Sequence, residues 1–187
     1  MFPDNYPNLT TKRLLMRPMT IADSEVVVQW RNSLHVRSMN RNDQLLDVDA
    51  HREWFLSTRD KRIDYIVALI EAGQPIGSTS FTLQKNESGE LWGELGKYIG
   101  EKGALGKGFA FEFSLEWIRF GFEVLGIDMI FSQTRKTNSP NIHINQKLGF
   151  EIVPFLYKGQ QISDEWVLMS MIRDYWLNEL SERRSWE

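Results

Sequence analysis

One glycine-rich segment constrains the fold of this chain more than any other part of its sequence. Gly103, Gly106 and Gly108 form a G-x-x-G-x-G pattern that follows a strand-like run and precedes an apolar stretch with helical spacing. A turn of this kind exposes backbone N–H groups at the positive end of a helix dipole, where a pyrophosphate binds well. The alternative is an ordinary turn, because loops are often rich in glycine. The pattern therefore predicts a strand, a turn and a helix in succession, with a candidate anion site at the turn.

The position of the glycine turn excludes two common nucleotide-binding folds. A dinucleotide-binding βαβ unit has its glycines after a first parallel strand, whereas these glycines come late and follow antiparallel hairpins. A P-loop has Ser or Thr directly after its Gly-Lys pair, and this chain has Gly108 there. The turn therefore belongs to another kind of mixed fold.

The segments around the turn predict an α+β domain with a mixed seven-stranded sheet flanked by helices. The expected strands are residues 13–19, the two runs on either side of Gly73 and Pro75, and residues 92–99, 127–134, 150–157 and 166–172. Helices are expected after Thr20, from Asp49, and over residues 108–124, 138–147 and 174–184. A length of 187 residues without an internal repeat or linker favours a single domain over residues 1–187.

The composition argues against several classes of protein. A formal net charge of -3, without a cluster of Lys and Arg, argues against a nucleic-acid binder. The absence of cysteine excludes a disulfide framework, a thiolate nucleophile and a cysteine zinc site, and no metal is expected. No run approaches the roughly 20 apolar residues of a membrane helix, and the chain does not open with a secretory pattern. We therefore expect a cytoplasmic protein, monomeric or homodimeric, without a nucleic-acid or membrane partner.

Two longer blocks of sequence resemble the GNAT superfamily of acetyl-CoA-dependent N-acetyltransferases. The block ELGKYIGEKGALGKGFAFE, from Glu94 to Glu112, resembles the family's fourth strand, pyrophosphate turn and central helix. The block NSPNIHINQKLGF, from Asn138 to Phe150, resembles its later signature, and the opening KRLLMRPMTIAD is similar to the branch that contains ribosomal-protein N-terminal acetyltransferases. The resemblance covers nearly the whole chain. It implies a sheet splayed between its fourth and fifth strands, with acetyl-CoA in the cleft and a primary amine as the acetyl acceptor.

The resemblance also implies which residues contact acetyl-CoA. Main-chain groups of Tyr98 and Ile99 are expected to bind the pantetheine arm, and Asn138 is expected to contact the co-substrate beyond the fifth strand. The residues expected to wrap the pyrophosphate are Gly103, Leu105, Gly106, Lys107, Gly108, Phe109 and Ala110. Gly103 departs from the family pattern, which usually has Gln or Arg there, so one side-chain contact is lost.

Acetyl transfer requires a neutral amine, so a proton has to leave the acceptor before its nitrogen attacks the thioester. Glu94 is the first candidate for the base, because it lies on the strand that leads to the turn; the alternative is a strand carboxylate with a surface hydrogen bond. His51 is the rival, since an unperturbed imidazole titrates near about pH 6.5, although a lone helical His is more often structural. Asn145 stands where many family members have a Tyr that protonates the leaving thiolate, which leaves the general acid unassigned.

The N-terminal third contains the candidate acceptor residues. Its pattern of Arg, His and aromatic residues is similar to nucleotide-sugar amine N-acetyltransferases of the pseudaminic-acid pathway type: Trp30, Arg31, Asn32, His35, Arg37, His51, Trp54 and Phe55. Arg suits a diphosphate and an aromatic face suits a nucleobase. The alternative for the aromatic residues is that they anchor two amphipathic helices in the core. The alternative for the charged residues is that they form a solvent-exposed helix face. The resulting hypothesis is a nucleotide-linked amino sugar as acceptor. A protein N-terminus or small amine, and a non-catalytic CoA-binding sensor, remain as alternatives.

Overall fold

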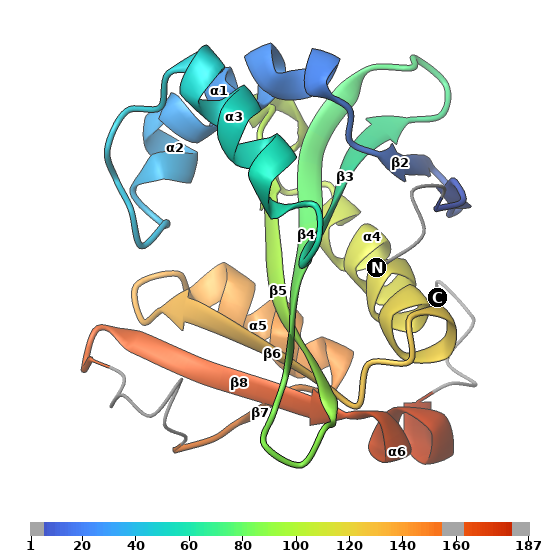
Figure 1. Ribbon diagram of the computed structural model, residues 1–187. Coiled ribbons are helices and arrows are strands. Elements are labelled where there is room, and N and C mark those ends of the chain that lie inside the picture. The colour runs from blue at the N-terminus through green and yellow to red at the C-terminus, as the bar shows by residue number, and fades with distance from the viewer. Residues whose placement is uncertain (1–5, 155–162, 181–187) are drawn as a thin grey trace.

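A strongly twisted sheet organises the chain, of which the computed structural model describes residues 6–154 and 163–180 (Figure 1). The strand order across the sheet is β1-β2-β3-β4-β5-β6-β8-β7, and every pairing is antiparallel except that of β5 with β6. The strands are β1 (Leu9–Thr10), β2 (Leu14–Pro18), β3 (Arg62–Leu69), β4 (Pro75–Lys85), β5 (Leu91–Ile99), β6 (Met129–Arg135), β7 (Glu151–Ile152) and β8 (Trp166–Ile172).

Helices cover both faces of this sheet (Figure 1). One face carries α1 (Ser24–Asn32), α2 (Leu34–Arg37) and α3 (Val48–Thr58), and the other carries α4 (Phe109–Arg119) and α5 (Ser139–Leu148). Shorter helical segments complete the described chain: η1 (Ile21–Asp23), η2 (Lys102–Ala104), η3 (Phe120–Val124), α6 (Arg173–Tyr175) and η4 (Trp176–Leu180).

The predicted α+β architecture is confirmed, with differences in detail. The described sheet has eight strands rather than seven, because the short β1 adds a strand at one edge. The strand predicted over 150–157 is only Glu151–Ile152 among the described residues, and positions 155–157 lie outside them. The helix α2 was not predicted, because its four residues are too short to show periodicity. The predicted C-terminal helix is helical as far as Leu180, beyond which the predicted residues are not described.

An aromatic cluster beneath α4 forms the main core. The ring of Trp117 stacks on Phe81 with centroids 4.8 Å apart and on Phe120 with centroids 5.3 Å apart, and all three side chains are fully buried. Gly121 has to be a glycine, because a Cβ there would lie 2.8 Å from the Phe81 ring. Truncating a buried Trp or Phe typically costs about 3–5 kcal/mol, so this cluster contributes strongly to holding α4 against the sheet.

The central strands β5 and β6 separate after a short parallel ladder. Their pairing ends at Glu94↔Phe131, yet β5 continues with β4 to Ile99 and β6 continues with β8 to Arg135. Beyond Glu94 the two strands therefore present free edges to each other. This confirms the predicted splay, since β5 and β6 are the strands that correspond to the fourth and fifth of the resembled family. Backbone groups on such edges are available to a ligand.

Candidate active site

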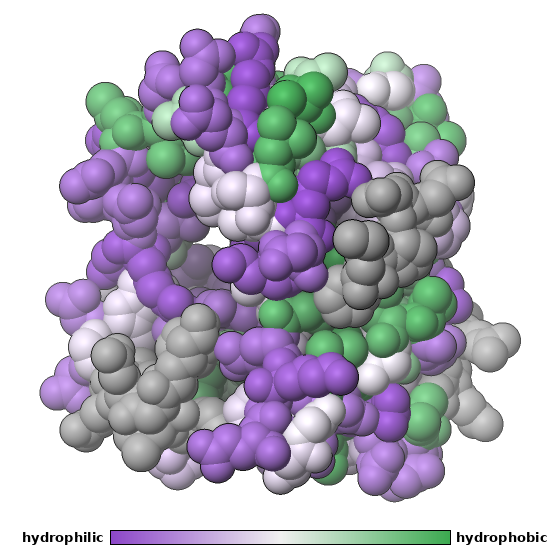
Figure 2. Space-filling view, in the orientation of Figure 1, coloured by the Kyte–Doolittle hydropathy of each residue, from purple (hydrophilic) through white to green (hydrophobic). Residues whose placement is uncertain are grey.

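The separation of β5 and β6 opens a cleft of about 610 Å³, here called the large cleft. Figure 2 shows a hollow between the α1–α3 layer and the β6–β8 half of the molecule, with mainly hydrophilic residues around it. Five of the residues predicted to contact acetyl-CoA line the large cleft: Tyr98, Ile99, Leu105, Ala110 and Asn138. The side chain of Asn138 accepts a hydrogen bond from the backbone N–H of Asn141 and thereby caps α5. The fold thus brings the two resembled sequence blocks to opposite walls of one cleft.

The glycine turn has the geometry of an anion cradle. Gly106 and Gly108 have φ values of 74° and 79°, a left-handed conformation that favours glycine, and α4 begins directly after Gly108. Within the described chain, the backbone N–H groups of residues 106–111 have no hydrogen-bond acceptor, and the first helical bond is from Glu112 N–H to the Gly108 carbonyl. Free N–H groups at the start of an eleven-residue helix suit a pyrophosphate.

Gly103 contributes less to this turn than its place in the sequence pattern indicates. It lies in η2 without a left-handed φ, and a Cβ added to it would meet no atom within 4 Å. The strict requirement for glycine therefore falls on the last two glycines of the pattern.

A network from the turn between β1 and β2 holds the glycine turn in place, and no sequence pattern predicted it. Arg13 makes an ion pair of 2.6 Å with the buried Glu112 and donates a hydrogen bond of 3.0 Å to the Lys107 carbonyl. The hydroxyl of Thr11 donates to the same carboxylate at 2.6 Å, and the Arg13 guanidinium lies 4.4 Å from the centre of the Phe109 ring. A sequence pattern does not predict the contact of Arg13 with Glu112, because the two residues lie far apart in sequence.

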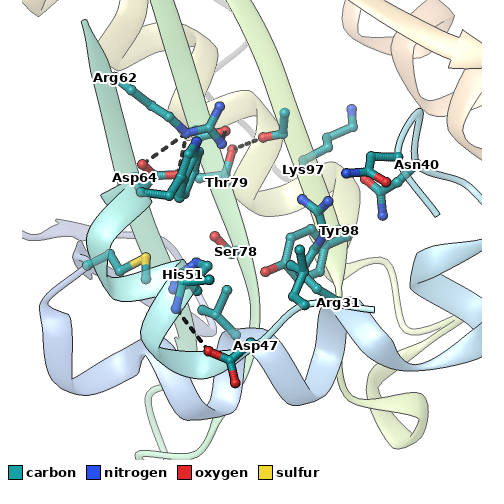
Figure 3. A pocket seen from close by; sticks show the side chains of 18 residues that line it. Arg31, Asn40, Asp47, His51, Arg62, Asp64, Ser78, Thr79, Lys97 and Tyr98 are labelled. Atoms are coloured by element: carbon teal, nitrogen blue, oxygen red, sulfur yellow. Dashed lines mark hydrogen bonds and ion pairs between the residues drawn. The ribbon is translucent and has the colours of Figure 1, made fainter. Parts of the chain in front are cut away.

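A second cavity of about 400 Å³ lies beneath α1 and α3 and is here called the small cavity (Figure 3). Two of its charged residues form an ion pair: Arg62 Nε lies 3.0 Å from the Asp64 carboxylate, and Arg62 also donates to Ser80 and Thr82. Arg31 points into the cavity without a hydrogen bond or ion pair to any described residue, and its Nε is buried. The Arg31 guanidinium therefore has no direct anionic contact among the described residues, although the charge of Asp64 acts on it from a distance.

Burial changes the proton affinities of several residues in the small cavity. Burial, together with the nearby charges of Arg31 and Arg62, lowers the pKa of His51, so its imidazole is neutral at pH 7. Burial raises the pKa of Tyr98 to about 12 and raises that of Asp64 in spite of Arg62. Burial lowers the pKa of Lys97 to about 7. Partly neutral Lys97 is thus able to exchange protons near neutral pH, whereas His51 stays neutral there.

Glu94, the first candidate base, lies at the point where β5 and β6 separate. Its carboxylate is 22% exposed, lines the large cleft and forms an ion pair of 2.6 Å with Arg41. His51 lines the small cavity instead, with its Nδ1 buried and without a hydrogen-bond partner among the described residues. The two candidates thus belong to different cavities.

The residues predicted to contact the acceptor fall into different places. Trp54 is 40% exposed at the rim of the small cavity, with the Arg62 guanidinium 5.1 Å from the centre of its ring. Asn32 has a structural role, because its side chain exchanges hydrogen bonds of 2.9 and 2.8 Å with the backbone of Leu46, which lines the small cavity. Arg37 lies on α2 and lines neither cavity.

Trp30 does not fit the predicted acceptor role. It is 2% exposed, lines neither cavity and donates a hydrogen bond of 2.7 Å to Glu101. A Cβ on Gly100 would lie 2.2 Å from its ring, so Trp30 packs directly against the backbone before the glycine turn. Phe55 is likewise a core residue and packs with Trp30 in the smaller apolar cluster. Trp30 and Phe55 therefore anchor the helices in the core, which is the alternative to a role in acceptor binding.

Comparison with known proteins agrees with this geometry. A family model described as an acetyltransferase (GNAT) domain matches residues 13–151. This chain belongs to the GNAT acetyltransferase family. As a member of that family it is an acetyl-CoA-dependent acetyltransferase. It is 26% identical over 148 residues to an uncharacterized N-acetyltransferase, p20, of Bacillus licheniformis, covering 76% of this chain and 82% of that protein.

Solved structures share the fold of this GNAT acetyltransferase at low sequence identity. Spermidine N-acetyltransferase from Vibrio cholerae, in complex with CoA and spermine, has a TM-score of 0.75 at 18% identity, covering 88% of this chain and 98% of that one. Ribosomal-protein-S5-alanine acetyltransferase from Vibrio fischeri has a TM-score of 0.72 at 16% identity, covering 91% and 99%. These neighbours act on different acceptors, so they support the fold and leave the acceptor of this enzyme to its own residues.

The described residues lack a metal-binding cluster and a membrane-spanning helix. Within residues 6–154 and 163–180, no three His, Asp or Glu side chains are grouped closely enough to hold a metal ion. No helix in the same ranges is both long and apolar enough to cross a membrane.

Proposed function

We propose that this GNAT acetyltransferase moves the acetyl group of acetyl-CoA to a primary amine on an acceptor that also carries an anionic group. The acetyl donor occupies the large cleft, with its pyrophosphate on the free N–H groups after Gly106 and its pantetheine arm along the free edge of β5. The acceptor enters the small cavity. The two cavities share seven lining residues, among them Arg31, Lys97 and Tyr98, so their occupants meet at the free edge of β5.

Arg31 is the observation on which the anionic group rests. Its guanidinium lines the small cavity and has no ion-pair partner among the described residues, while Arg62 is already paired with Asp64. The other carboxylate in the lining, Asp47, accepts hydrogen bonds from the backbone N–H groups of Asp49 and Ala50 at the start of α3. A buried cation without a partner is costly, and an acceptor phosphate or carboxylate removes that cost.

The same charge distribution disfavours a polyamine acceptor. A polyamine is a polycation, and cations are favoured in cavities lined with free carboxylates. Arg31 and Arg62 both line the small cavity, which leaves no such excess of negative charge. We therefore propose that this enzyme shares the fold of the spermidine-acetylating neighbours but acts on a different class of acceptor.

We assign the acceptor more finely to the nucleotide-linked amino sugars. Arg31 suits the diphosphate, and the half-exposed Trp54 at the rim offers a face on which a nucleobase stacks. Glu94 is proposed as the base that takes the proton of the acceptor ammonium, because it lies where the strands separate; His51 is the alternative base.

The test is the rate of free CoA release from acetyl-CoA with a panel of acceptors. The panel contains a UDP-linked amino sugar, the free amino sugar, spermidine, a small neutral amine and a peptide with a free N-terminus. Preferred turnover of the UDP-linked sugar supports the proposal. Preference for the peptide or for spermidine contradicts the acceptor assignment, and acetyl-CoA binding without turnover of any acceptor favours a sensor.

A further inference from the structure

Lys97 lines both cavities and therefore lies where they meet. Figure 3 shows its place among the residues of the small cavity. It belongs to the part of β5 beyond Glu94, where pairing with β6 has ended. On its other side the backbone stays paired with Thr79 of β4. A rigid strand therefore carries the Lys97 side chain at the open edge of the sheet.

The amine of Lys97 has one hydrogen-bond partner in the described structure. Nζ donates to Oδ1 of Asn145 on α5 at 2.5 Å. Asn145 is fully buried, and its Nδ2 lies 3.8 Å from the sulfur of Met169. In the described ranges no carboxylate lies within 4.0 Å of the Lys97 amine. Lys97 is therefore held by a neutral amide and not by a counter-ion.

The direction of the large cleft brings the reactive end of the donor toward Lys97. The anion cradle at Gly106 and Gly108 follows the C-terminal end of β5. A pantetheine arm that starts there and runs along the free edge passes Ile99 and Tyr98 before it reaches Lys97. The closed end of the cleft, at Glu94, limits how far the arm extends.

We propose that Lys97 is the general acid of this enzyme and protonates the sulfur of coenzyme A as the thioester bond breaks, while Asn145 is the positioning residue that holds its amine. This inference rests on the proposed acetyl transfer. It also accounts for the Asn at position 145, where resembled proteins often have an acidic Tyr, because the proton donor now comes from the strand across the cleft.

The proton affinity of Lys97 suits this step. Burial without a carboxylate partner lowers its pKa to about 7, so both protonation states are populated at neutral pH. An ordinary thiol has a pKa of about 8.5, and a neighbouring cation lowers it by about 1–3 units, so the proton affinities of Lys97 and of the CoA sulfur are closely matched. A lysine with an ordinary pKa near 10.4 is a weaker acid than the thiol and donates poorly.

The step balances without any further reactant. The acceptor ammonium loses one proton to the base, and its nitrogen then forms a bond to the acetyl carbon and releases a second proton to water as the amide forms. The carbon–sulfur bond breaks, its electron pair goes to sulfur, and Lys97 Nζ transfers a proton to that sulfur. The neutral Lys97 amine then regains a proton from water, and the products are the acetylated amine and the CoA thiol.

The first experiment compares pH profiles of kcat/KM for acetyl-CoA in the wild type, Lys97→Met and Lys97→Arg. We expect the wild-type value to fall above about pH 7, because only the ammonium form donates. We expect Lys97→Met to lose this fall of kcat/KM at high pH and to lower kcat about 10²-fold. The control is Lys85→Met, at an exposed lysine at the far end of β4, which is expected to change neither the pH profile nor kcat. A rate that rises through pH 7 with Lys97 present identifies a base and overturns the proposal.

Lys97→Arg separates proton donation from fixed charge. Arg stays protonated at all working pH values, so it keeps the positive charge and cannot release a proton. We expect Lys97→Arg to have a kcat close to that of Lys97→Met. A kcat close to that of the wild type means that charge alone suffices, and it overturns the assignment of a general acid.

The second experiment needs no turnover, so it is independent of the acceptor. The thiol of CoA bound to the protein is titrated by the ultraviolet absorbance of its thiolate. A cation within about 4–6 Å lowers the pKa of an acid by about 1–3 units, so we expect bound CoA to ionise at lower pH on the wild type than on Lys97→Met. Equal titration on both proteins overturns the inference, whereas failure of every acceptor in the panel, with this difference intact, contradicts only the proposed function.

Discussion

Arg13 Nε donates a hydrogen bond of 2.6 Å to the carboxylate of Glu112, although 99 residues separate the two in sequence. This contact joins the turn before β2 to the first turn of α4, and Arg13 also donates a hydrogen bond to the Lys107 carbonyl within the glycine turn. A residue near the N-terminus therefore stabilises the anion cradle, which lies in the middle of the sequence.

Replacing Arg13 by Ala is expected to weaken CoA binding and to lower stability. The substitution leaves the buried Glu112 without its cation, and a loss of about 1–3 kcal/mol is expected because Arg13 itself is partly exposed. Arg52→Ala is a matched control, since among the described residues Arg52 pairs only with the largely exposed Glu25 and Asp49. Urea denaturation and calorimetry with CoA check both effects, and CoA affinity equal to that of the wild type contradicts the supporting role.

Replacing Gly108 by Val is expected to abolish measurable acetyl-CoA binding. The left-handed φ of 79° is strained for a β-branched residue by about 1–2 kcal/mol, and the side chain covers the free N–H groups. Gly89→Val is the control for strain alone, because Gly89 has a φ of 85° in the open turn between β4 and β5, away from both cavities. If calorimetry finds normal acetyl-CoA affinity in a folded Gly108→Val protein, the turn is not the pyrophosphate site.

Replacing Glu94 by Gln is expected to reduce kcat about 10²-fold to 10⁴-fold with little change in acetyl-CoA binding. The amide keeps the shape and the contact with Arg41 while losing the ability to accept a proton. His51→Gln is measured in parallel, because the lowered pKa of His51 keeps it neutral and competent as a base at pH 7. Near-normal turnover of Glu94→Gln, with a large loss in His51→Gln, transfers the role to His51.

Replacing Arg31 by Met is expected to raise the acceptor KM for a UDP-linked amino sugar by an equivalent of about 1.5–3 kcal/mol. Met keeps much of the side-chain volume in the small cavity and removes the charge. The KM for the free amino sugar is expected to change little, because it lacks the diphosphate. An equal effect on both sugars contradicts a charge contact between Arg31 and the diphosphate.

Replacing Lys97 by Met is expected to stabilise the fold while it removes the proposed acid. Because the folded-state pKa of Lys97 is about 7 and its unfolded value is near 10.5, the unfolded chain binds the extra proton between these values. Wild-type stability therefore rises with pH across this window, and the advantage of Lys97→Met is largest at and below pH 7. Denaturation at about pH 7 and about pH 9 measures it, and an advantage that does not shrink with pH contradicts the lowered pKa.

The sequence by itself determined the local elements and the family. The glycines at 106 and 108, the Asn138 cap and Gly149 encode the ends of α4 and α5 through backbone preferences that depend on neighbouring residues only. The alternating and periodic apolar runs identified most strands and helices for the same reason. Short elements such as α2 and β1 escaped prediction, because four or two residues carry no measurable period.

Only the tertiary structure decided which side chains share a cavity. Sequence could not separate the buried Trp30 from Trp54 at the rim, since both are aromatic residues on helices. Lys97 is one lysine among many until β6 turns away from β5 and α5 brings Asn145 to its amine. Charge state, burial and pairing depend on residues distant in the chain, so the proton affinity of Lys97 and the unpaired Arg31 are properties of the folded protein alone.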